Sequence, residues 1–152
     1  HIFAQTQKMK KETFFIPFST PSSKNGKRWT GKHMIHSKTV MNYIKNTKPY
    51  WEEHSEEFRA IIDTLEKPVN ISFKFIRGTR HKFDYVNPLQ TVQDQMTIYG
   101  WIEDDNCDEI MPSFEKYIYD KEKAGCHITI KANNKPVNDE SRTNNEDSRE
   151  DT

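Results

Sequence analysis

The sequence is poor in cysteine and glycine, with only two cysteines and five glycines among its 152 residues. Cys107 and Cys126 are too few for a disulfide framework. Neither belongs to a paired zinc-binding motif, although His81 lies in the same region as Cys107. No apolar run is long enough to cross a bilayer, and no signal-peptide pattern opens the chain. We therefore expect a cytoplasmic protein that does not bind membranes.

Net charge is also missing, because 23 basic and 23 acidic side chains cancel. The cancellation hides an asymmetry along the chain. Residues 1–50 carry ten Lys or Arg against one acid, and residues 51–131 carry ten against sixteen. A basic first third followed by an acid-rich middle is typical of a protein that holds a polyanion and also a cation. Chance clustering on a solubilising surface is the plainer alternative.

The hydrophobic pattern predicts an α+β fold, a single small domain in which helices pack on a mixed or antiparallel sheet. The folded domain is expected to cover residues 13–131, after a flexible N-terminus over residues 1–12. Residues 132–152 contain almost no apolar side chains. Because such a segment cannot bury enough apolar surface to order itself, we expect a disordered polar tail.

Several segments have the composition of strands. Alternation of apolar and polar residues is clearest over residues 69–76, which is typical of a half-buried strand. In residues 13–18, a proline near the end favours a place at the edge or end of a sheet. Residues 33–36 are expected to form a short strand. Residues 110–119 and 126–131 are expected to pair as a hairpin.

Three helices are expected. Ser37 is suited to cap a helix that runs to about residue 46, and Pro49 favours the start of another. A cap, a first-turn proline, a capping-box glutamine and a closing glycine mark the third helix at Asn87, Pro88, Gln90 and Gly100.

Acidic side chains surround the third helix. Asp84 precedes it, Asp94 lies within it, and Asp104 and Asp105 follow it. A helix of about twelve residues extends about 18 Å, and the six residues after it can span up to about 20 Å. The chain can therefore return Asp104 and Asp105 towards Asp84. The polar helix face that holds Asp94 can look into the same cleft.

Carboxylates that converge repel one another unless a cation or proton joins them, and hard oxygen ligands suit Mg²⁺ or Mn²⁺. Such ions activate water and neutralise the leaving oxygen in phosphodiester hydrolysis. Arg80 and Lys82 would then hold the phosphate backbone. Each acid also has a plainer role. Asp84 can cap a turn, Asp94 can be a solvated helix residue, and the two aspartates after the helix can form an ordinary acidic loop.

The segment over residues 80–109 resembles the catalytic core of the RusA-type Holliday junction resolvases. That family has basic residues, Asp-x-Asp-Asn, a helix with a lysine and then an aspartate, and a Gly-aromatic turn ending in Asp-Asp. The matching residues are Arg80, Lys82, Asp84, Asn87, Asp94, Gly100-Trp101 and Asp104-Asp105. The segment Pro21-Ser22-Ser23-Lys24-Asn25 also resembles the family's Pro-Ser-Asn loop, and order and length agree over residues 13–131.

Two positions depart from the family pattern. Val86 stands where the family has its second aspartate, and a valine cannot bind a metal. Either Asp94 or Asp104 has to replace the missing carboxylate, or the site is weakened, or the protein binds junctions without cutting them. Gln90 stands in place of a lysine that would steady the phosphate or the transition state. It can still hydrogen-bond a phosphate or a metal-bound water.

The resemblance implies a Mg²⁺- or Mn²⁺-dependent endodeoxyribonuclease, bacterial or phage-encoded, that resolves four-way junctions by paired hydrolysis during recombination and repair. Catalysis would depend on Asp84, Asp94 and Asp105, with Asp104 as a further metal ligand. The DNA-binding side chains would be Lys24, Asn25, Lys27, Arg28, Arg80 and Lys82, with Asn87 and Gln90 in support. Two like-oriented strands need two equivalent sites, which implies a homodimer without a small-molecule cofactor.

Three alternatives stay open at this stage. The same carboxylates would serve a nuclease that prefers flaps or plain duplex. A non-catalytic DNA-binding protein would explain the departures at Val86 and Gln90. A purely structural protein would bind neither metal nor DNA. Metal-dependent cleavage of a synthetic four-way junction is the measurement that separates them.

Overall fold

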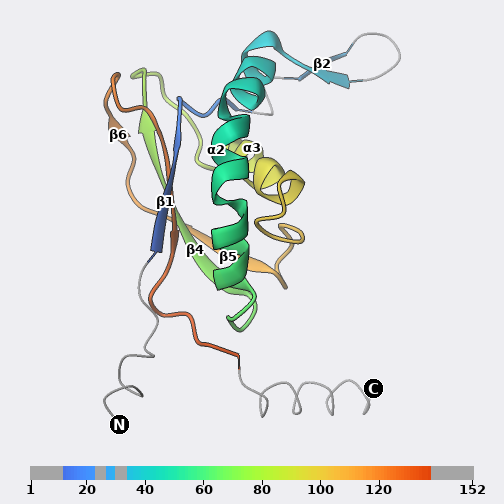
Figure 1. The fold of residues 1–152 in the computed structure, drawn as a ribbon. Helices are drawn as coiled ribbons and strands as arrows, with labels where there is room; N and C mark the ends of the chain where they lie inside the picture. The colour runs from blue at the N-terminus through green and yellow to red at the C-terminus, as the bar shows by residue number, and fades with distance from the viewer. Residues whose placement is uncertain (1–11, 23–26, 30–33, 138–152) are drawn as a thin grey trace.

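The computed structural model describes residues 12–22, 27–29 and 34–137, with the backbone alone for residues 27–29 and 34–36. Within these ranges two helices accompany a five-stranded mixed sheet (Figure 1). The predicted α+β domain is therefore confirmed. The predicted flexible N-terminus, apart from Glu12, and the predicted tail from residue 138 onward lie outside the described residues.

The sheet has the strand order β1–β7–β4–β5, and β6 also pairs with β4. Its strands are β1 (Glu12–Pro17), β4 (Val69–Arg77), β5 (Ile110–Phe114), β6 (Ile118–Tyr119) and β7 (Gly125–Ile130). β7 lies antiparallel between β1 and β4. β5 and β6 both run parallel to β4. As its proline predicts, β1 is an edge strand.

The predicted hairpin between residues 110–119 and 126–131 is wrong. The first segment forms two short strands, β5 and β6, instead of one. The second segment, β7, pairs with β4 and β1 and not with its predecessor in the chain. The cause is the crossover through α3 (Val86–Ile98), which returns the chain parallel to β4.

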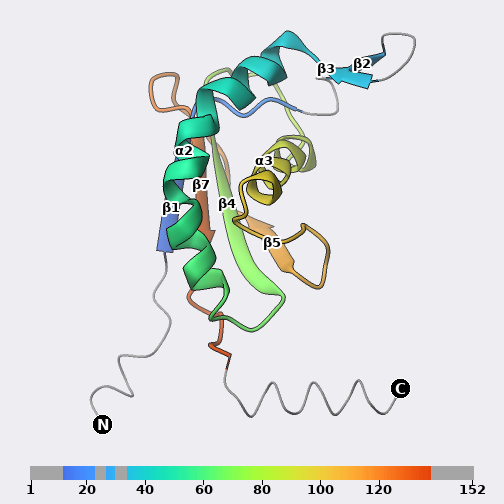
Figure 2. The ribbon, with the colours of Figure 1, turned by 45° about the vertical axis from the view of Figure 1, so that its right-hand side comes forward.

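The first described helix, α2 (Lys38–Ile62), is longer than predicted, because Pro49 lies inside it and does not open a second helix. Ser37 caps α2 as predicted, with its Oγ accepting a hydrogen bond of 3.4 Å from the Val40 N–H. The helix changes direction part-way along (Figure 2). A proline has this effect, since it removes a backbone donor and crowds the preceding turn. Among the described residues, no helix is both long and apolar enough to span a membrane.

The second helix, α3, begins at Val86, one residue before the predicted cap at Asn87. Tyr85 occupies the N-cap position and makes no side-chain cap hydrogen bond. The predicted capping box is also wrong, because the Gln90 amide donates a hydrogen bond of 3.0 Å to Asp94 Oδ1. The Gln90 side chain therefore points along the helix to the following turn and not back to its N-terminus.

The predicted closing glycine of α3 is confirmed. Gly100 has a φ of 76°, and its N–H and that of Trp101 return to carbonyls of the last helical turn, the latter to Met96 O at 2.8 Å. These bonds form a Schellman motif, in which glycine avoids the steric cost of a positive φ. Arg59 of α2 fixes the turn from outside, donating to Gly100 O at 3.2 Å and to Glu103 Oε1 at 2.9 Å.

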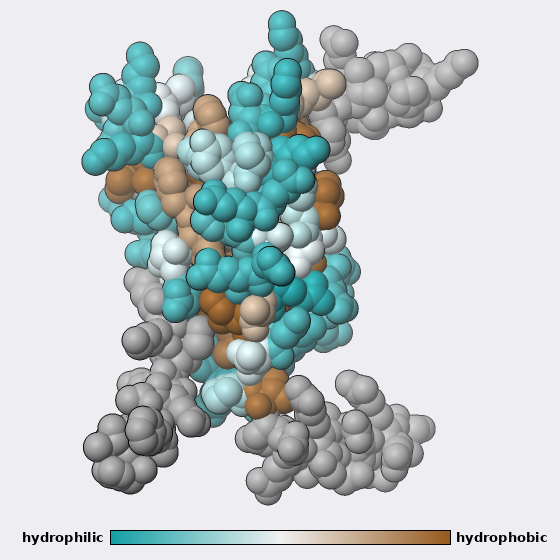
Figure 3. All heavy atoms as spheres, in the orientation of Figure 1, coloured by the Kyte–Doolittle hydropathy of each residue, from teal (hydrophilic) through white to brown (hydrophobic). Residues whose placement is uncertain are grey.

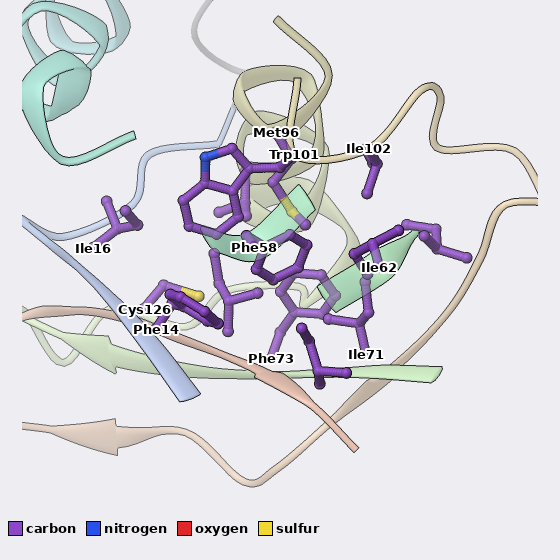
Figure 4. Close-up of a cluster of buried hydrophobic side chains, with 14 of the residues drawn as sticks. Phe14, Ile16, Phe58, Ile62, Ile71, Phe73, Met96, Trp101, Ile102 and Cys126 are labelled. Carbon is purple, nitrogen blue, oxygen red and sulfur yellow. The ribbon is translucent and has the colours of Figure 1, made fainter. Parts of the chain in front are cut away.

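The core lies between the sheet and the two helices (Figure 4). Strands β1, β4 and β7 and both helices contribute Phe14, Ile16, Phe58, Ile62, Ile71, Phe73, Met96 and Cys126. Trp101 is fully buried, with its ring centroid 4.5 Å from that of Phe58, and its Nε1 donates to Trp51 O at 2.9 Å. On the face shown in Figure 3, hydrophilic residues cover most of the surface and apolar residues form separate small areas.

A two-stranded antiparallel ribbon, β2 (Lys27–Trp29) and β3 (Met34–His36), precedes α2 and extends away from the main sheet (Figure 1). The short strand predicted over residues 33–36 is therefore confirmed at the level of the backbone.

Residues 132–137, predicted as the start of the tail, are bound to the sheet. The Asn134 side chain accepts a hydrogen bond from the Asn70 N–H at 2.7 Å and donates to Asn70 O at 2.9 Å. Farther along, the Val137 N–H donates to Thr64 O at 2.8 Å. A polar segment can order without a hydrophobic face when its amides satisfy backbone groups near the start of a strand, as Asn134 does for Asn70 of β4.

Candidate functional site

Three of the four predicted aspartates line one hollow, here called the acidic hollow. Asp94, Asp104 and Asp105 share this space of about 360 Å³ with Gln95 and with apolar residues of α2 such as Val40. Asp94 comes from the middle of α3. The other two come from the loop that follows the Schellman turn, which Arg59 holds in place.

The fourth aspartate, Asp84, lies elsewhere. It lines a second space of about 460 Å³, here called the basic hollow, together with Arg77, Lys82, residues 19–22 and the first turns of both helices. Asp84 Oδ1 accepts a hydrogen bond of 3.3 Å from the Val86 N–H. The structure thus gives Asp84 the turn-capping contact that the sequence offered as its plainer role, and does not bring it into the acidic hollow.

Hydrogen bonds and burial give the acidic side chains different proton affinities. Hydrogen bonds from the Asn106 side chain and the Asp105 N–H, at 2.9 and 2.8 Å, lower the pKa of the Asp104 carboxyl. Burial, followed by the charges of Asp104 and Asp94, raises the pKa of the Asp105 carboxyl. Asp105 therefore experiences the negative potential of the hollow, and a bound proton or cation would relieve it.

Gln95 also lines the acidic hollow. Gln95 is 2% exposed, and its Oε1 is buried with no hydrogen-bond partner among the described residues. A buried carbonyl oxygen without a donor costs about 1–3 kcal/mol. A cation in the hollow would offset this cost if the side chain turned its oxygen towards the ion.

The donor set suits Mg²⁺ or Mn²⁺, since carboxylate and amide oxygens are hard ligands. The arrangement is not that of a finished site, because no group of three His, Cys, Asp or Glu side chains in the described ranges is placed to hold a metal ion.

The predicted DNA-binding residues are dispersed. Arg80 is exposed, and its guanidinium lies 3.9 Å from the centroid of the Tyr119 ring. Lys82 and Asn87 line the basic hollow. The remaining predicted contacts are Lys24 and Asn25, which lie outside the described residues, and Lys27 and Arg28, whose backbone lies in β2.

The two hollows have a common boundary. Thr91 lines the acidic hollow and Pro21 lines the basic one. Thr91 Oγ1 donates a hydrogen bond of 2.8 Å to Pro21 O, which fastens the loop after β1 to α3.

No model of a known protein family matches the chain, and a search of curated proteins finds no match to it. The resemblance to RusA-type resolvases therefore depends on the motif residues and their order alone.

Two residues of the hollows were missed in the sequence. Gln95 is a glutamine beside the apolar stripe of α3, and a polar residue at that position is a signal for an internal ligand. Arg77 is the last residue of β4, the strand that precedes the basic segment Arg80 to Lys82. Neither signal shows which space the side chain enters.

Proposed function

We propose that the chain is a divalent-cation-dependent endodeoxyribonuclease that cuts four-way DNA junctions as a homodimer. The observation that carries this proposal is the acidic hollow, which Asp94, Asp104 and Asp105 line together. A divalent cation held by these carboxylates would supply an activated water and neutralise the leaving oxygen of a phosphodiester. The chain's own contribution is to hold hard oxygen donors in a partly buried place.

The direct test is cleavage of a synthetic four-way junction in Mg²⁺ or Mn²⁺. We expect Asp105→Asn to abolish cleavage and to leave junction binding intact or tighter, because repulsion towards DNA falls. Asp108→Asn is the matched control, since Asp108 is exposed in the same loop and lines neither hollow. If Asp105→Asn cuts as well as the wild type, the acidic hollow is not where the cation binds.

Asp84→Asn gives a separate result. The family resemblance implies loss of cleavage, whereas the turn-capping contact implies only a less stable start of α3. Measuring cleavage and thermal unfolding on the same preparation separates these two roles.

A non-catalytic junction-binding protein is the second candidate. It is favoured by the separation of Asp84 from the other aspartates and by Val86, which is 61% exposed at the first residue of α3. This candidate predicts salt-sensitive junction binding without cleavage in any divalent cation. A single turnover of wild-type protein on a junction rules it out.

A further inference from the structure

The basic hollow contains polar groups that the proposed cation site does not use. Donor side chains converge on it from four segments of the chain, namely Ser19, Thr20, Thr39, Arg77, Lys82 and Asn87. Arginine, lysine, hydroxyl and amide groups are the side chains that proteins use to hold phosphate oxygens.

Arg77 is the central cation of this hollow. It is half-buried, donates to Thr20 O at 3.3 Å and stacks 4.3 Å from the centroid of the Phe83 ring. Its Nε–H is buried and has no acceptor among the described residues. Burial lowers the pKa of Arg77, which shows that its charge is poorly solvated.

The positive charge of the hollow is only partly compensated. In the described part of the chain, neither Arg77 nor Lys82 forms a salt bridge. Asp84 lines the same hollow, so its carboxylate offsets one of the two positive charges there. A poorly solvated charge without an ion-pair partner is costly, and an anion entering the hollow would offset part of that cost.

The N-terminus of α2 adds to the positive potential. Thr39 stands in the first turn of α2, which contains no acidic residue, whereas at the start of α3 the N–H groups of Val86 and Asn87 already donate to Asp84. The N–H groups of a first turn have no acceptor within the helix, and the helix dipole places positive charge there. Anions bind at such ends when cationic side chains converge on the same place.

We propose that the basic hollow binds one phosphate group, held by Arg77 and Lys82 with the first turn of α2. For a DNA nuclease this group is a phosphodiester of the backbone, an identification that rests on the proposed function. A terminal phosphate or free inorganic phosphate presents the same chemistry, and the experiment separates these sources.

The test is a titration of ¹⁵N-labelled protein with inorganic phosphate, against potassium chloride at equal ionic strength. We expect saturable shifts of the Thr39 amide and of the Arg77 Nε–H signal in the wild type. Arg77→Gln should remove the response. Lys82→Gln should weaken it roughly tenfold, the value of one charge-assisted hydrogen bond. The matched control is Lys121→Gln, an exposed lysine that does not line the hollow.

Lys82→Gln also keeps the test valid if Arg77→Gln unfolds, because the exposed Lys82 side chain supports no packing. In DNA binding, Arg77→Gln and Lys82→Gln should each reduce the slope of log K against log salt by about one, and Lys121→Gln should not. If the hollow binds a backbone phosphodiester, duplexes with 5′-phosphate and 5′-hydroxyl ends should bind equally well. If it binds a terminal phosphate, the duplex with 5′-hydroxyl ends should lose affinity.

The two proposals fail separately. Absence of phosphate-dependent shifts in the wild type overturns the phosphate site even if junctions are cut. Shifts that Arg77→Gln abolishes, in a protein that neither binds nor cuts DNA, sustain the phosphate site and overturn the nuclease.

Discussion

Asp105 is a residue whose ionisation reports on its neighbours. Burial, and then the charges of Asp104 and Asp94, raise the pKa of its carboxyl. We predict that Asp104→Asn moves this pKa back towards the ordinary value without reaching it, because burial remains. A carboxyl ¹³C titration by NMR measures the change, and Asp108→Asn should leave it unmoved. An unaltered pKa in Asp104→Asn would mean that the two carboxylates do not interact.

The raised pKa of Asp105 has a consequence for stability. Between the ordinary aspartate pKa of about 3.9 and the raised value, the folded state binds more protons than the unfolded state. The stability that comes from protonating Asp105 is therefore present at low pH and lost as pH rises through this window. Asp104 acts in the opposite direction, since its lowered pKa gives stability that is lost as pH falls. Urea unfolding of the wild type and Asp105→Asn across acidic pH should differ in slope.

Substitution of Gln95 shows whether this buried side chain is a metal ligand or only an unsatisfied polar group in the core. We predict that Gln95→Met raises the unfolding free energy without metal by about 1 kcal/mol, because it removes a buried oxygen that lacks a donor. The same change should raise the Mg²⁺ concentration needed for junction cleavage. Gln93→Met is the control, since Gln93 is a buried glutamine of the same helix that lines neither hollow. If Gln95→Met is less stable than the wild type and needs the same Mg²⁺ concentration for cleavage, the Gln95 oxygen stabilises the fold and is not a metal ligand.

Among the elements, the segment after β7 depends on one side chain. Asn134 satisfies both backbone groups of Asn70 and also donates to Lys131 O at 2.8 Å. We predict that Asn134→Ala lowers the unfolding free energy by roughly 2 kcal/mol, because the Asn70 N–H loses its acceptor and the Asn70 carbonyl keeps only the Lys131 N–H as donor. Chemical denaturation measures this loss. Asn133→Ala, on an exposed neighbour, should have almost no effect.

Pro49 imposes a cost on α2. A proline inside a helix removes one backbone hydrogen bond and costs about 3 kcal/mol relative to alanine. We predict that Pro49→Ala raises the unfolding free energy by up to about 3 kcal/mol. Lys48→Ala, at the preceding exposed position, is the control for helix propensity. If Pro49→Ala is neutral or destabilising, the bend in α2 is needed to seat its first half against the loop after β1.

Elements were predictable where the signal is local. The Ser37 cap, the Gly100 C-terminus and the alternation of β4 each depend on residues a few positions apart. Strand pairing was not predictable, because the neighbour of β7 is decided by the crossover through α3 and not by the composition of β7. Pro49 was misread since a first-turn proline and an interior proline have the same local sequence signature.

For the whole molecule, DNA affinity should depend on salt through the basic N-terminal third. We predict that the combined change Lys24→Ala, Lys27→Ala and Arg28→Ala weakens junction binding and reduces the slope of log K against log salt by about one per lost phosphate contact. Fluorescence anisotropy at several salt concentrations measures the slope. The combined change Lys121→Ala and Lys123→Ala, in the exposed turn before β7, is the control. An unchanged slope would place the DNA on another surface.

Part of the candidate site could be predicted at this scale. The length of the chain predicted that Asp104 and Asp105 return towards Asp84, and this is wrong, whereas the polar face of α3 placed Asp94 in the same cleft as Asp104 and Asp105, which they do share. The length of the chain between these residues could not show that Asp84 lies outside the acidic hollow, because the position of Asp84 depends on a loop distant in sequence. The loop after β1 is fastened to Thr91 and lines the hollow that contains Asp84.

The hydrogen bond between Thr91 and Pro21 joins a residue that lines the acidic hollow to one that lines the basic hollow. Ligands in the two hollows are coupled if binding of one of them changes the strength of this contact. If a cation in the acidic hollow strengthens phosphate binding by some factor, phosphate strengthens cation binding by the same factor, since linkage between two equilibria is reciprocal. The protein would then gather its ion most readily when nucleic acid is already bound, and free metal would meet a site of lower affinity.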